Sequence, residues 1–263
     1  MTKFDGKKIR DEILGDLKKQ VASLSVKPSL AVIWSGADPV SEKYINSKKK
    51  VAADLGLEFS LFEIKKEKDI VKKIAALNSD RNISGIMVQM PLASDIDRQK
   101  VISAILPEKD VDGLRYCTGL DSKNFPPVVL AVLEAIKSSG VSLVESKVAI
   151  IGQGFLVGFP LSKILKDQVA DLRLIDDKVK NLSELTHDAD IIISATGQAG
   201  IISPVIVKDG AVLIDAGTTE VGGELKGDIA HSCYEKSRFY TPVPGGIGPV
   251  TVAMLFQNLL SKF

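Results

Sequence analysis

The sequence predicts an α/β protein with two domains, an N-terminal α/β domain and a second, Rossmann-like domain that binds a nucleotide. Three observations support this prediction. Short apolar runs alternate with helical stretches, which is typical of a parallel sheet covered by helices. A glycine-rich turn at 152–160 follows one of these runs. A stretch of about 20 residues, 106–127, carries no periodic pattern, and loops this long usually serve function or join domains.

The composition is that of an ordinary globular protein of 263 residues, 45% of them hydrophobic and 25% charged. A formal net charge of +1 gives no electrostatic reason to expect binding to nucleic acid or to an acidic membrane. The two cysteines form no CxxC motif and no metal-ligand cluster with the histidines, so we expect no metal and a reduced, cytoplasmic protein. The N-terminus is too polar for a signal peptide, and no apolar run approaches the roughly 18 residues that span a bilayer.

The first domain is predicted from the spacing of its apolar residues. Residues 7–23 place apolar side chains on one helical face, and Ser29–Trp34 is a short apolar strand. A turn at 36–39 ends this strand, and Ser41 is expected to cap a helix that runs to Leu55. The elements that follow are a strand, a helix and a strand, at 57–63, 69–77 and 85–89.

We place the domain boundary in the aperiodic stretch. The first domain is expected to cover residues 1–120, completed by the C-terminal helix at about 243–263, and the second to cover residues 121–242. The strands expected in the second half of the chain lie at 148–151, 171–176, 190–194 and 211–215, and the helices at 128–139, 156–165 and 250–260.

The glycine-rich turn is the candidate phosphate site. An apolar strand ends at Gly152, Gly154 and Gly158 follow, and Pro160 is tolerated in the first turn of a helix. Glycines let the backbone approach a ligand closely, and free N–H groups at a helix N-terminus attract phosphate. The spacing is one residue longer than the usual G-x-G-x-x-G pattern, so a turn without a ligand stays an alternative.

Two acidic residues, Asp176 and Asp177, end the strand that follows this turn. An acid at this place accepts hydrogen bonds from the ribose 2′-hydroxyl of NAD and repels the 2′-phosphate of NADP. The alternative is that the pair only begins a polar turn.

Tyr44 and Lys48 are four residues apart on a predicted helix, so they share a face. A phenol and an amine at this separation can hydrogen-bond and transfer a proton. The alternative is a solvated helix surface, because Lys43, Lys49 and Lys50 surround them.

Gln89 and the pair Asp110 and Asp112 also follow the predicted elements of the first domain. Gln89 ends a strand, where open α/β sheets bind ligands, although a plain strand end is equally compatible. The two aspartates precede Gly113, so they either hold a heterocycle or form an Asx-type turn.

Taken together, the segments resemble the bifunctional methylenetetrahydrofolate dehydrogenase/methenyltetrahydrofolate cyclohydrolase family over nearly the whole chain. The KDVDG segment at 109–113 and the TPVPGGIGP segment at 241–249 are the most specific. The other segments appear in order as SxxYxxxK at 41–48, VQMPL at 88–92, IG at 151–152, VGFP at 157–160, IDxG at 214–217 and GD at 227–228.

The resemblance implies that the first domain with the final helix binds folate, that the middle of the chain binds a nicotinamide cofactor, and that a cleft lies between them. It implies oxidation of 5,10-methylenetetrahydrofolate with NAD(P) and hydrolysis of the product to 10-formyltetrahydrofolate. This one-carbon chemistry serves purine, methionine and histidine biosynthesis, and the family is generally homodimeric.

The resemblance also implies the roles of individual residues. Lys48 is the key residue of the cyclohydrolase step, supported by Tyr44 and Gln89, and Asp112 holds the pterin ring. The implied substrate-binding residues are Tyr44, Asp112, Pro244, Gly245 and Gly246. The implied cofactor-binding residues are Gly152, Gln153, Gly154, Val157, Gly158, Asp176, Thr196, Gly197 and Thr218.

Three departures from the family pattern concern the cofactor and the residues around the ligands. Gln153 replaces the arginine expected to bind the 2′-phosphate of NADP, so with Asp176 we expect NAD to be used at least as well as NADP. Lys178 or Lys180 is the alternative phosphate partner. The segment PPVV at 126–129 replaces P-C-T-P, and the pair at 218–219 replaces a common asparagine.

Other functions remain open at this point. One is another two-domain NAD(P) oxidoreductase, such as a shikimate-dehydrogenase-like enzyme. Others are a non-catalytic nucleotide-binding descendant and a dehydrogenase without cyclohydrolase activity. The joint presence of Lys48, Gln89 and Asp112 argues against the last two.

Overall fold

The computed structural model describes residues 1–36, 39–179 and 181–263, so part of the predicted turn at 36–39, and Lys180, lie outside the described residues. The chain divides into two compact units. The six-stranded unit comprises Met1–Arg10 and Val128–Thr251, and the three-stranded unit comprises Asp11–Pro127 and Val252–Phe263. This division falls at 127/128 rather than 120/121, and it groups the first ten residues with the six-stranded unit.

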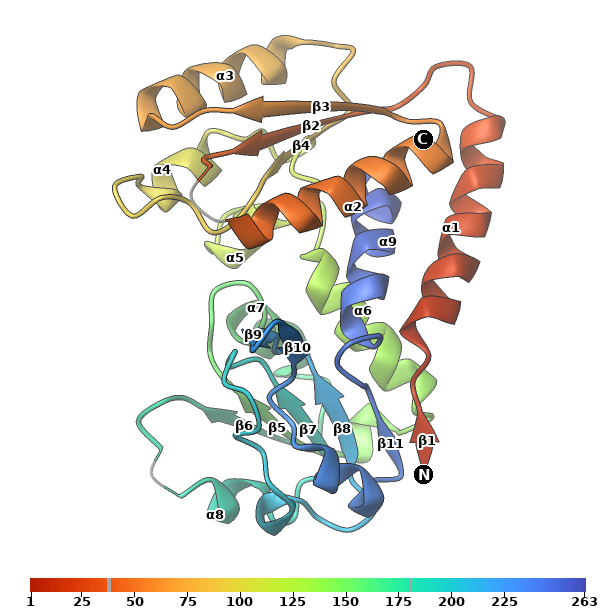
Figure 1. Cartoon of the computed structure of the whole chain (residues 1–263), viewed down its shortest axis with the longest axis vertical. Helices are drawn as coiled ribbons and strands as arrows, with labels where there is room; N and C mark the ends of the chain where they lie inside the picture. The colour runs from red at the N-terminus through yellow and green to blue at the C-terminus, as the bar shows by residue number, and fades with distance from the viewer. Residues whose placement is uncertain (37–38, 180) are drawn as a thin grey trace. The chain divides into compact units, whose positions relative to one another are not determined.

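The three-stranded unit is built on a parallel sheet with the order β3 (Glu58–Glu63), β2 (Ser29–Trp34), β4 (Gly85–Val88). The central strand β2 is buried almost throughout, which explains why its sequence is a continuous apolar run. Figure 1 shows α3 (Glu67–Ser79) on one side of this sheet and α2 (Pro39–Leu55) on the other.

Helices α1 (Gly6–Ala22) and α9 (Ile247–Leu260) join α2 on its side of the sheet. The core on this side takes buried residues from all three helices and from the sheet. They are Leu17, Leu30, Val32, Ala52, Leu55, Leu57, Met87, Val111, Leu255, Phe256, Leu259 and Leu260. The unit also contains the short helices α4 (Arg98–Ser103) and α5 (Leu114–Cys117).

The six-stranded unit is a parallel sheet in which the chain order of the strands is rearranged. The order is β1 (Thr2–Lys3), β11 (Phe239–Tyr240), β8 (Val212–Asp215), β7 (Ile191–Ser194), β5 (Lys147–Ile151) and β6 (Asp171–Ile175). Ile151 pairs with Ile175 on one side and with Ser194 on the other, and Ser194 pairs with Asp215. The carboxyl ends of four strands therefore align at one edge, where open α/β sheets bind ligands.

Helices and short connections complete this unit (Figure 1). The helices are α6 (Pro127–Ser138), α7 (Gly158–Leu165) and α8 (Leu182–Thr186), with short 3-10 helices at Leu143–Glu145, Pro204–Ile206 and His231–Lys236. An antiparallel hairpin joins β9 (Thr219–Val221) to β10 (Glu224–Lys226).

The predicted strands and long helices all form, with differences at their ends. Ser41 is not the cap of α2, because the helix begins at Pro39 and the buried Ser41 hydroxyl donates to the carbonyl of Met90 at 3.4 Å. Helix α7 begins at Gly158 rather than at 156, and α9 begins at Ile247. The two-residue strands β1 and β11, the short helices α4, α5 and α8 and the hairpin were missed, because such short elements show no periodicity.

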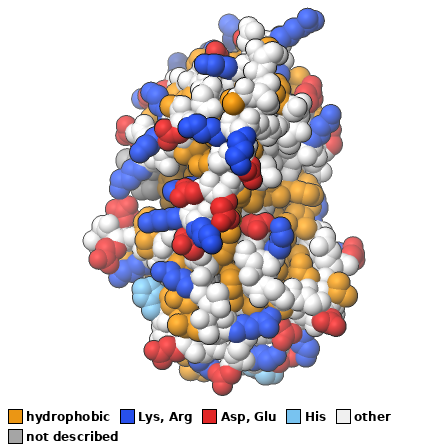
Figure 2. Space-filling view, turned by 90° about the vertical axis from the view of Figure 1, so that its right-hand side faces the viewer, with side chains coloured by type: hydrophobic (Ala, Val, Ile, Leu, Met, Phe, Trp, Pro, Cys, Tyr) orange, Lys and Arg blue, Asp and Glu red, His pale blue; other side chains and the backbone are white. Residues whose placement is uncertain are grey.

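Acidic and basic side chains are interspersed on the face shown in Figure 2. In the described part of the chain, no helix has the length and apolar character needed to cross a membrane.

Candidate active site

Lys48 lies on the inward side of α2, not on its solvated surface. The buried residues Ile45, Ala52 and Leu55 mark the helix stripe that faces the core. Lys48 falls within this stripe, one turn from Ile45 and one from Ala52, and it is partly buried, whereas its neighbour Lys49 is exposed. The helical register therefore separates Lys48 from the lysines around it.

The amine of Lys48 is held by Gln89, the first residue beyond β4. Lys48 Nζ donates to Oε1 of Gln89 at 2.9 Å. Gln89 Nε2 in turn donates to the carbonyl of Met90 at 2.6 Å, and the Gln89 side chain is only 8% exposed. The amide is thus fixed with its oxygen toward the amine, and the structure brings together two of the predicted site residues.

Asp112 is the third predicted residue that the structure brings to this site. Burial lowers the pKa of Lys48, and the charge of Asp112 opposes that shift. Burial likewise raises the pKa of Asp112 to about 6, the charge of Lys48 lowers it, and the charge of Asp110 raises it. Both groups can therefore exchange protons closer to neutral pH than a free lysine or aspartate, which is what proton transfer requires.

Asp110 has a structural role, because its carboxylate oxygens accept hydrogen bonds from residues of its own loop. It is fully buried and accepts the backbone N–H of Leu114 at 3.1 Å and of Arg115 at 2.9 Å. It also accepts the hydroxyl of Ser122 at 3.1 Å. The turn-forming alternative thus describes Asp110, while Asp112 remains the candidate for ligand binding.

The loop that carries Asp112 is anchored by two residues that the sequence analysis missed. Asn258 of α9 donates from Nδ2 to the carbonyls of Val111 and Phe125, both at 2.9 Å. The buried Arg115 donates from Nη1 to the carbonyl of Ile105 at 2.8 Å. The segment MLFQNLL sets two amides, Gln257 and Asn258, in an apolar helix sequence, and this is the signal that could have pointed to Asn258.

In the described part of the chain, Tyr44 does not make the hydrogen bond to Lys48 that the sequence led us to expect. Its side chain is 41% exposed, one helical turn before Lys48. Within the described residues no hydrogen bond joins Tyr44 to Lys48, so that expected contact is not formed in this structure. Among the described residues, the hydrogen-bond partner of the amine is Gln89.

The glycine-rich turn of the six-stranded unit is shaped by two close backbone approaches. Gly152 has φ +91°, and a Cβ on it would lie 2.6 Å from the carbonyl oxygen of Ala195. A Cβ on Gly158 would lie 1.8 Å from the carbonyl oxygen of Gly152. Only glycine fits either position. Gly154 meets nothing within 4 Å, and Gln153 donates from Nε2 to the carbonyl of Ile150 at 3.1 Å.

The other predicted cofactor residues lie at the same edge of the sheet as the turn. Thr196 and Gly197 follow β7, which pairs with β5, and Thr218 follows β8. Thr219 donates from its hydroxyl to the carbonyl of Gly197, which ties the two loops together. Val157 immediately precedes α7.

Asp176 follows β6, the edge strand beside β5. The residue is exposed, and its Oδ1 accepts the backbone N–H of Lys178 at 3.0 Å. The polar-turn alternative is therefore formed in the structure, at the strand end where a ribose acceptor is expected.

Pro244, Gly245 and Gly246 lie in the loop before α9, held by the start of α1. The N–H of Gly6 donates to the carbonyl of Gly245 at 3.1 Å. A Cβ on Gly6 would come within 1.9 Å of the carbonyl oxygen of Gly246, so this contact also requires glycine.

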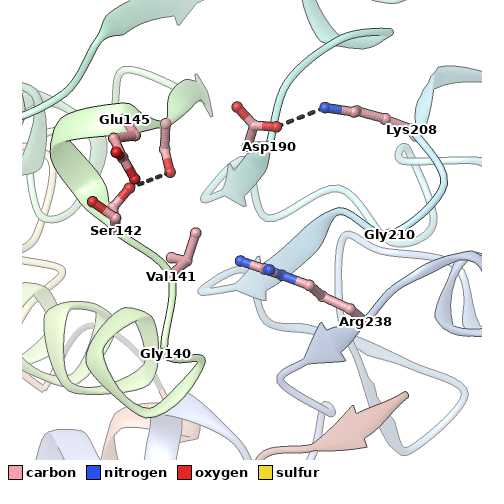
Figure 3. Close-up of a pocket in the computed structure, with 9 residues that line it drawn as sticks. Gly140, Val141, Ser142, Glu145, Asp190, Lys208, Gly210 and Arg238 are labelled. Atoms are coloured by element: carbon pink, nitrogen blue, oxygen red, sulfur yellow. Dashed lines mark hydrogen bonds and ion pairs between the residues drawn. The ribbon is translucent and has the colours of Figure 1, made fainter.

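A cavity of about 420 Å³ opens at the opposite, amino edge of the six-stranded sheet (Figure 3). It is lined by the 140–146 segment and by Asp190, Lys208, Gly210 and Arg238. Lys208 Nζ is already paired with Asp190 at 2.6 Å. None of the predicted site residues lines this cavity.

Comparison with known families shows which family the chain belongs to. The family model for the tetrahydrofolate dehydrogenase/cyclohydrolase catalytic domain matches residues 4–112, and the model for the NAD(P)-binding domain of the same family matches residues 126–263. The chain belongs to this family. The predicted two-domain α/β architecture and the predicted enzyme class, a bifunctional dehydrogenase and cyclohydrolase of tetrahydrofolate one-carbon metabolism, are confirmed.

Individual members of the tetrahydrofolate dehydrogenase/cyclohydrolase family align over nearly the full chain. The bifunctional protein FolD of Macrococcus caseolyticus is 37% identical over 98% of this chain and 95% of its own length. The crystal structure of FolD from Campylobacter jejuni is 32% identical, with a TM-score of 0.93 over 100% of this chain and 98% of that one. The Trypanosoma brucei enzyme, solved with NADP and an inhibitor, is 30% identical with a TM-score of 0.91 over 98% and 95%.

The shikimate-dehydrogenase alternative is only a distant match. Shikimate 5-dehydrogenase from Listeria monocytogenes is 14% identical, with a TM-score of 0.56 over 90% of this chain and 92% of that one. This likeness concerns the fold alone.

Proposed function

We propose that this chain oxidises 5,10-methylenetetrahydrofolate with NAD(P) and then hydrolyses the methenyl product to 10-formyltetrahydrofolate, with Lys48 moving the proton of the hydrolytic step. The observation that carries the proposal is the hydrogen bond of 2.9 Å between Lys48 Nζ and Gln89 Oε1. It holds an amine of lowered pKa in a fixed position. A positioned base with a pKa nearer to neutral is what general acid–base catalysis requires.

The hydrolytic step follows from the chemistry of the substrate. The methenyl group is a cationic amidinium, so water adds to its carbon and a proton must move before the ring opens. Neutral Lys48 accepts that proton, and protonated Lys48 returns it to the departing ring nitrogen. Gln89 accepts one N–H of the amine, which orients the nitrogen lone pair. As the C–N bond breaks and the formyl C=O forms, the remaining hydroxyl proton is released to solvent. The cycle therefore converts the methenyl cation and one water into neutral 10-formyltetrahydrofolate and one proton, and it restores Lys48.

Asp112 is proposed to hold the pterin ring, because a carboxylate accepts hydrogen bonds from the ring N–H groups. Its elevated pKa of about 6 still leaves it largely ionised at neutral pH. The exposed ring of Tyr44 is proposed as an apolar contact of the substrate. Pro244, Gly245 and Gly246 are proposed as further substrate contacts.

The six-stranded unit is proposed to bind the dinucleotide at the carboxyl edge of its sheet. Gly152 and Gly158 support this, because their close backbone contacts leave no room for side chains beside the turn. Gly154, Val157, Thr196, Gly197 and Thr218 complete the proposed contacts. When bound, NAD(P) supplies the hydride acceptor. The turn and the start of α7 orient its phosphates through backbone N–H groups.

We propose further that NAD is used at least as well as NADP. Gln153 carries no charge and donates to the carbonyl of Ile150, so the expected cation for the 2′-phosphate is missing at this position. The exposed carboxylate of Asp176 favours a ribose hydroxyl over a phosphate. Lys178 is the exposed alternative, since Lys180 lies outside the described residues.

A cytoplasmic homodimer is the assembly we propose. Strand β6 is the last strand of its sheet in the described part of the chain, and its Leu174 is 48% exposed, so this strand offers an open outer edge with an apolar side chain. Sedimentation of the purified protein checks this point, and a monomer at assay concentrations would contradict it.

The proposed function is tested by supplying 5,10-methylenetetrahydrofolate with NAD or NADP in separate reactions. Reduced nicotinamide and the methenyl intermediate are followed together. We expect reduction without lasting accumulation of the intermediate. Binding of cofactor and folate without reduction would indicate a non-catalytic descendant, and stable accumulation of the methenyl compound would indicate a dehydrogenase alone.

A further inference from the structure

Two buried carboxyl groups lie beneath the loops at the carboxyl edge of the six-stranded sheet. Asp215 ends β8 and Asp228 follows β10, and their side chains are 1% and 0% exposed. Neither belongs to the residues proposed above to contact substrate or cofactor. Burial raises the pKa of Asp215 to about 7, backbone N–H donors lower it, and the charge of Asp228 raises it.

The carboxylate of Asp215 accepts three backbone donors. Its Oδ1 accepts the N–H of Gly217 at 3.0 Å and of Asp228 at 3.2 Å, and its Oδ2 accepts the N–H of Ile229 at 2.9 Å. Asp215 thereby joins the end of β8 to the segment that carries Asp228.

The side chain of Asp228 reaches the neighbouring strand. Its Oδ2 accepts the hydroxyl of Ser194 at 2.8 Å and the backbone N–H of Thr196 at 2.6 Å. Its Oδ1 is buried without a hydrogen-bond partner among the described residues. A Cβ on Gly217 would lie 2.0 Å from that Oδ1, so the backbone of Gly217 rests directly on the carboxyl group.

The loop held by Asp228 is the one that packs against the glycine-rich turn. The position of a Cβ on Gly152 is 2.6 Å from the carbonyl oxygen of Ala195 and 3.1 Å from Cγ2 of Thr196. Because a side chain at 152 would clash there, the backbone of Gly152 lies close against the 195–196 segment, and the N–H of Ala195 also donates to the carbonyl of Ile151 at 2.8 Å. A shift of Thr196 is therefore expected to reach the turn through this close packing. Contacts run in sequence from Asp228 through Thr196 to the turn.

We propose that Asp228 is a positioning residue for the dinucleotide, which fixes the glycine-rich turn through Thr196 without touching the cofactor. The proposal rests on the proposed function, in that the turn binds the cofactor phosphates. Both donors meet Oδ2, and a charged carboxylate oxygen binds them more strongly than a neutral amide oxygen. An asparagine would also place an NH2 group where Oδ1 now lies. The buried Oδ1 has no hydrogen-bond partner among the described residues, so the NH2 group of an asparagine would enter a place where the native side chain makes no hydrogen bond.

The test is Asp228→Asn, with Asp190→Asn as the matched control. Asp190 is an aspartate of the same sheet that accepts the N–H of Lys147 at 2.9 Å at the opposite edge. For each protein, the Kd of the dinucleotide is measured by titration, and KM and kcat are measured for both activities. The cyclohydrolase is assayed with supplied methenyltetrahydrofolate, which needs no cofactor and so reports on the intact fold.

We expect Asp228→Asn to raise the Kd and KM of the dinucleotide about tenfold or more, with cyclohydrolase turnover and folate KM retained. Asp190→Asn should leave all of these within about twofold. Equal losses in the dehydrogenase and cyclohydrolase activities would show that Asp228 only supports the fold, and this would overturn the proposal. An unchanged dinucleotide Kd would also overturn it.

If Asp228→Asn does not fold, Ser194→Ala decides. It removes one of the two donors to Asp228 Oδ2 at little change of volume and should raise the dinucleotide Kd several-fold, on the order of one lost hydrogen bond. An unchanged Kd in Ser194→Ala would overturn the proposal. A wild-type protein that binds no dinucleotide would instead contradict the proposed function.

Discussion

Lys48 Nζ donates to Gln89 Oε1 at 2.9 Å, and Gln89 is itself fixed by its bond to the carbonyl of Met90. Because Gln89 carries no charge, burial is the main influence on the pKa of Lys48, and burial lowers that pKa. The choice of glutamine over an acid at this position therefore keeps the neutral form of Lys48 within reach of ordinary pH.

Gln89→Glu tests this relationship. A carboxylate beside Lys48 stabilises the ammonium form and raises the lysine pKa, so the neutral base appears only at higher pH. Wild-type cyclohydrolase activity should rise with pH through the lowered pKa of Lys48. In the variant we expect the same rise about one pH unit or more higher, with lower activity at neutral pH.

The pH profile with supplied methenyltetrahydrofolate is the measurement, and Gln99→Glu on the exposed side of α4 is the control. Superimposable profiles for wild type and Gln89→Glu would mean that Lys48 does not carry the observed titration.

Asp112→Asn should raise the stability of the protein at neutral pH and weaken its binding of substrate. The pKa of Asp112 is about 6 in the folded protein against an ordinary 3.8, so the folded state binds this proton more tightly than the unfolded chain. Stability of the wild type therefore falls as pH rises from 3.8 to about 6 because of this group. The asparagine variant lacks that loss. The free energy of unfolding of the variant minus that of the wild type should therefore be more favourable at pH 7 than at pH 4 by ~1–2 kcal/mol.

Urea denaturation of both proteins across this pH range checks the stability part. The same variant should bind folate more weakly, since the neutral amide replaces the proposed carboxylate partner. A stability difference that does not change between the two pH values would contradict the assignment of a raised pKa.

The long elements of the fold were predictable from sequence, and the reason lies in burial. Strands β2 and β5 are covered on both faces, so their sequences are continuous apolar runs with clear ends. Strands β1 and β11 have two residues each, and they form through pairing between distant parts of the chain, β1 with β11 and β11 with β8. No local pattern of two residues marks a strand.

The site was predictable in its residue types but not in its geometry. The four lysines of α2 look alike in sequence, and only the position of Ile45 and Ala52 on the folded helix separates Lys48 from the others. Asp110 and Asp112 are likewise distinguished only in the folded structure, because the carboxylate of Asp110 accepts the backbone N–H groups of Leu114 and Arg115. Knowledge of the family supplied the roles that spacing left open.

Gln153→Arg should shift cofactor choice. An arginine at this position adds a cation beside the turn, which favours the 2′-phosphate of NADP through charge-assisted hydrogen bonds. We expect the ratio of kcat/KM for NADP to that for NAD to rise about tenfold or more. Gln168→Arg, at an exposed position after α7, makes the same chemical change and should leave the ratio unaltered.

The wild-type ratio matters as much as the shift. A large preference for NADP in kcat/KM of the unmodified protein would contradict the NAD proposal and direct attention to Lys178.

Gly158→Ala should destabilise the six-stranded unit. The added Cβ would lie 1.8 Å from the carbonyl oxygen of Gly152, and that oxygen belongs to backbone that cannot rotate away. We expect a loss of about 3 kcal/mol in the free energy of unfolding. Gly154→Ala is the control, because nothing lies within 4 Å of its Cβ and its φ is not positive, so its effect should stay within about 1 kcal/mol.

Thermal unfolding of the two variants and the wild type gives the comparison. Equal melting temperatures for Gly158→Ala and Gly154→Ala would show that the turn relaxes to accept a side chain, which the packing described above does not allow.

The central claim, that Lys48 performs the hydrolytic step, is tested most directly by cyclohydrolase turnover of Lys48→Met beside Lys49→Met. Methionine has a similar unbranched side chain but no group that can accept or donate a proton. Lys49 is the exposed neighbour on the same helix. The account predicts a fall of about 100-fold or more in Lys48→Met, the usual range for removing a general base, and wild-type turnover in Lys49→Met. Full turnover of methenyltetrahydrofolate by Lys48→Met would contradict it.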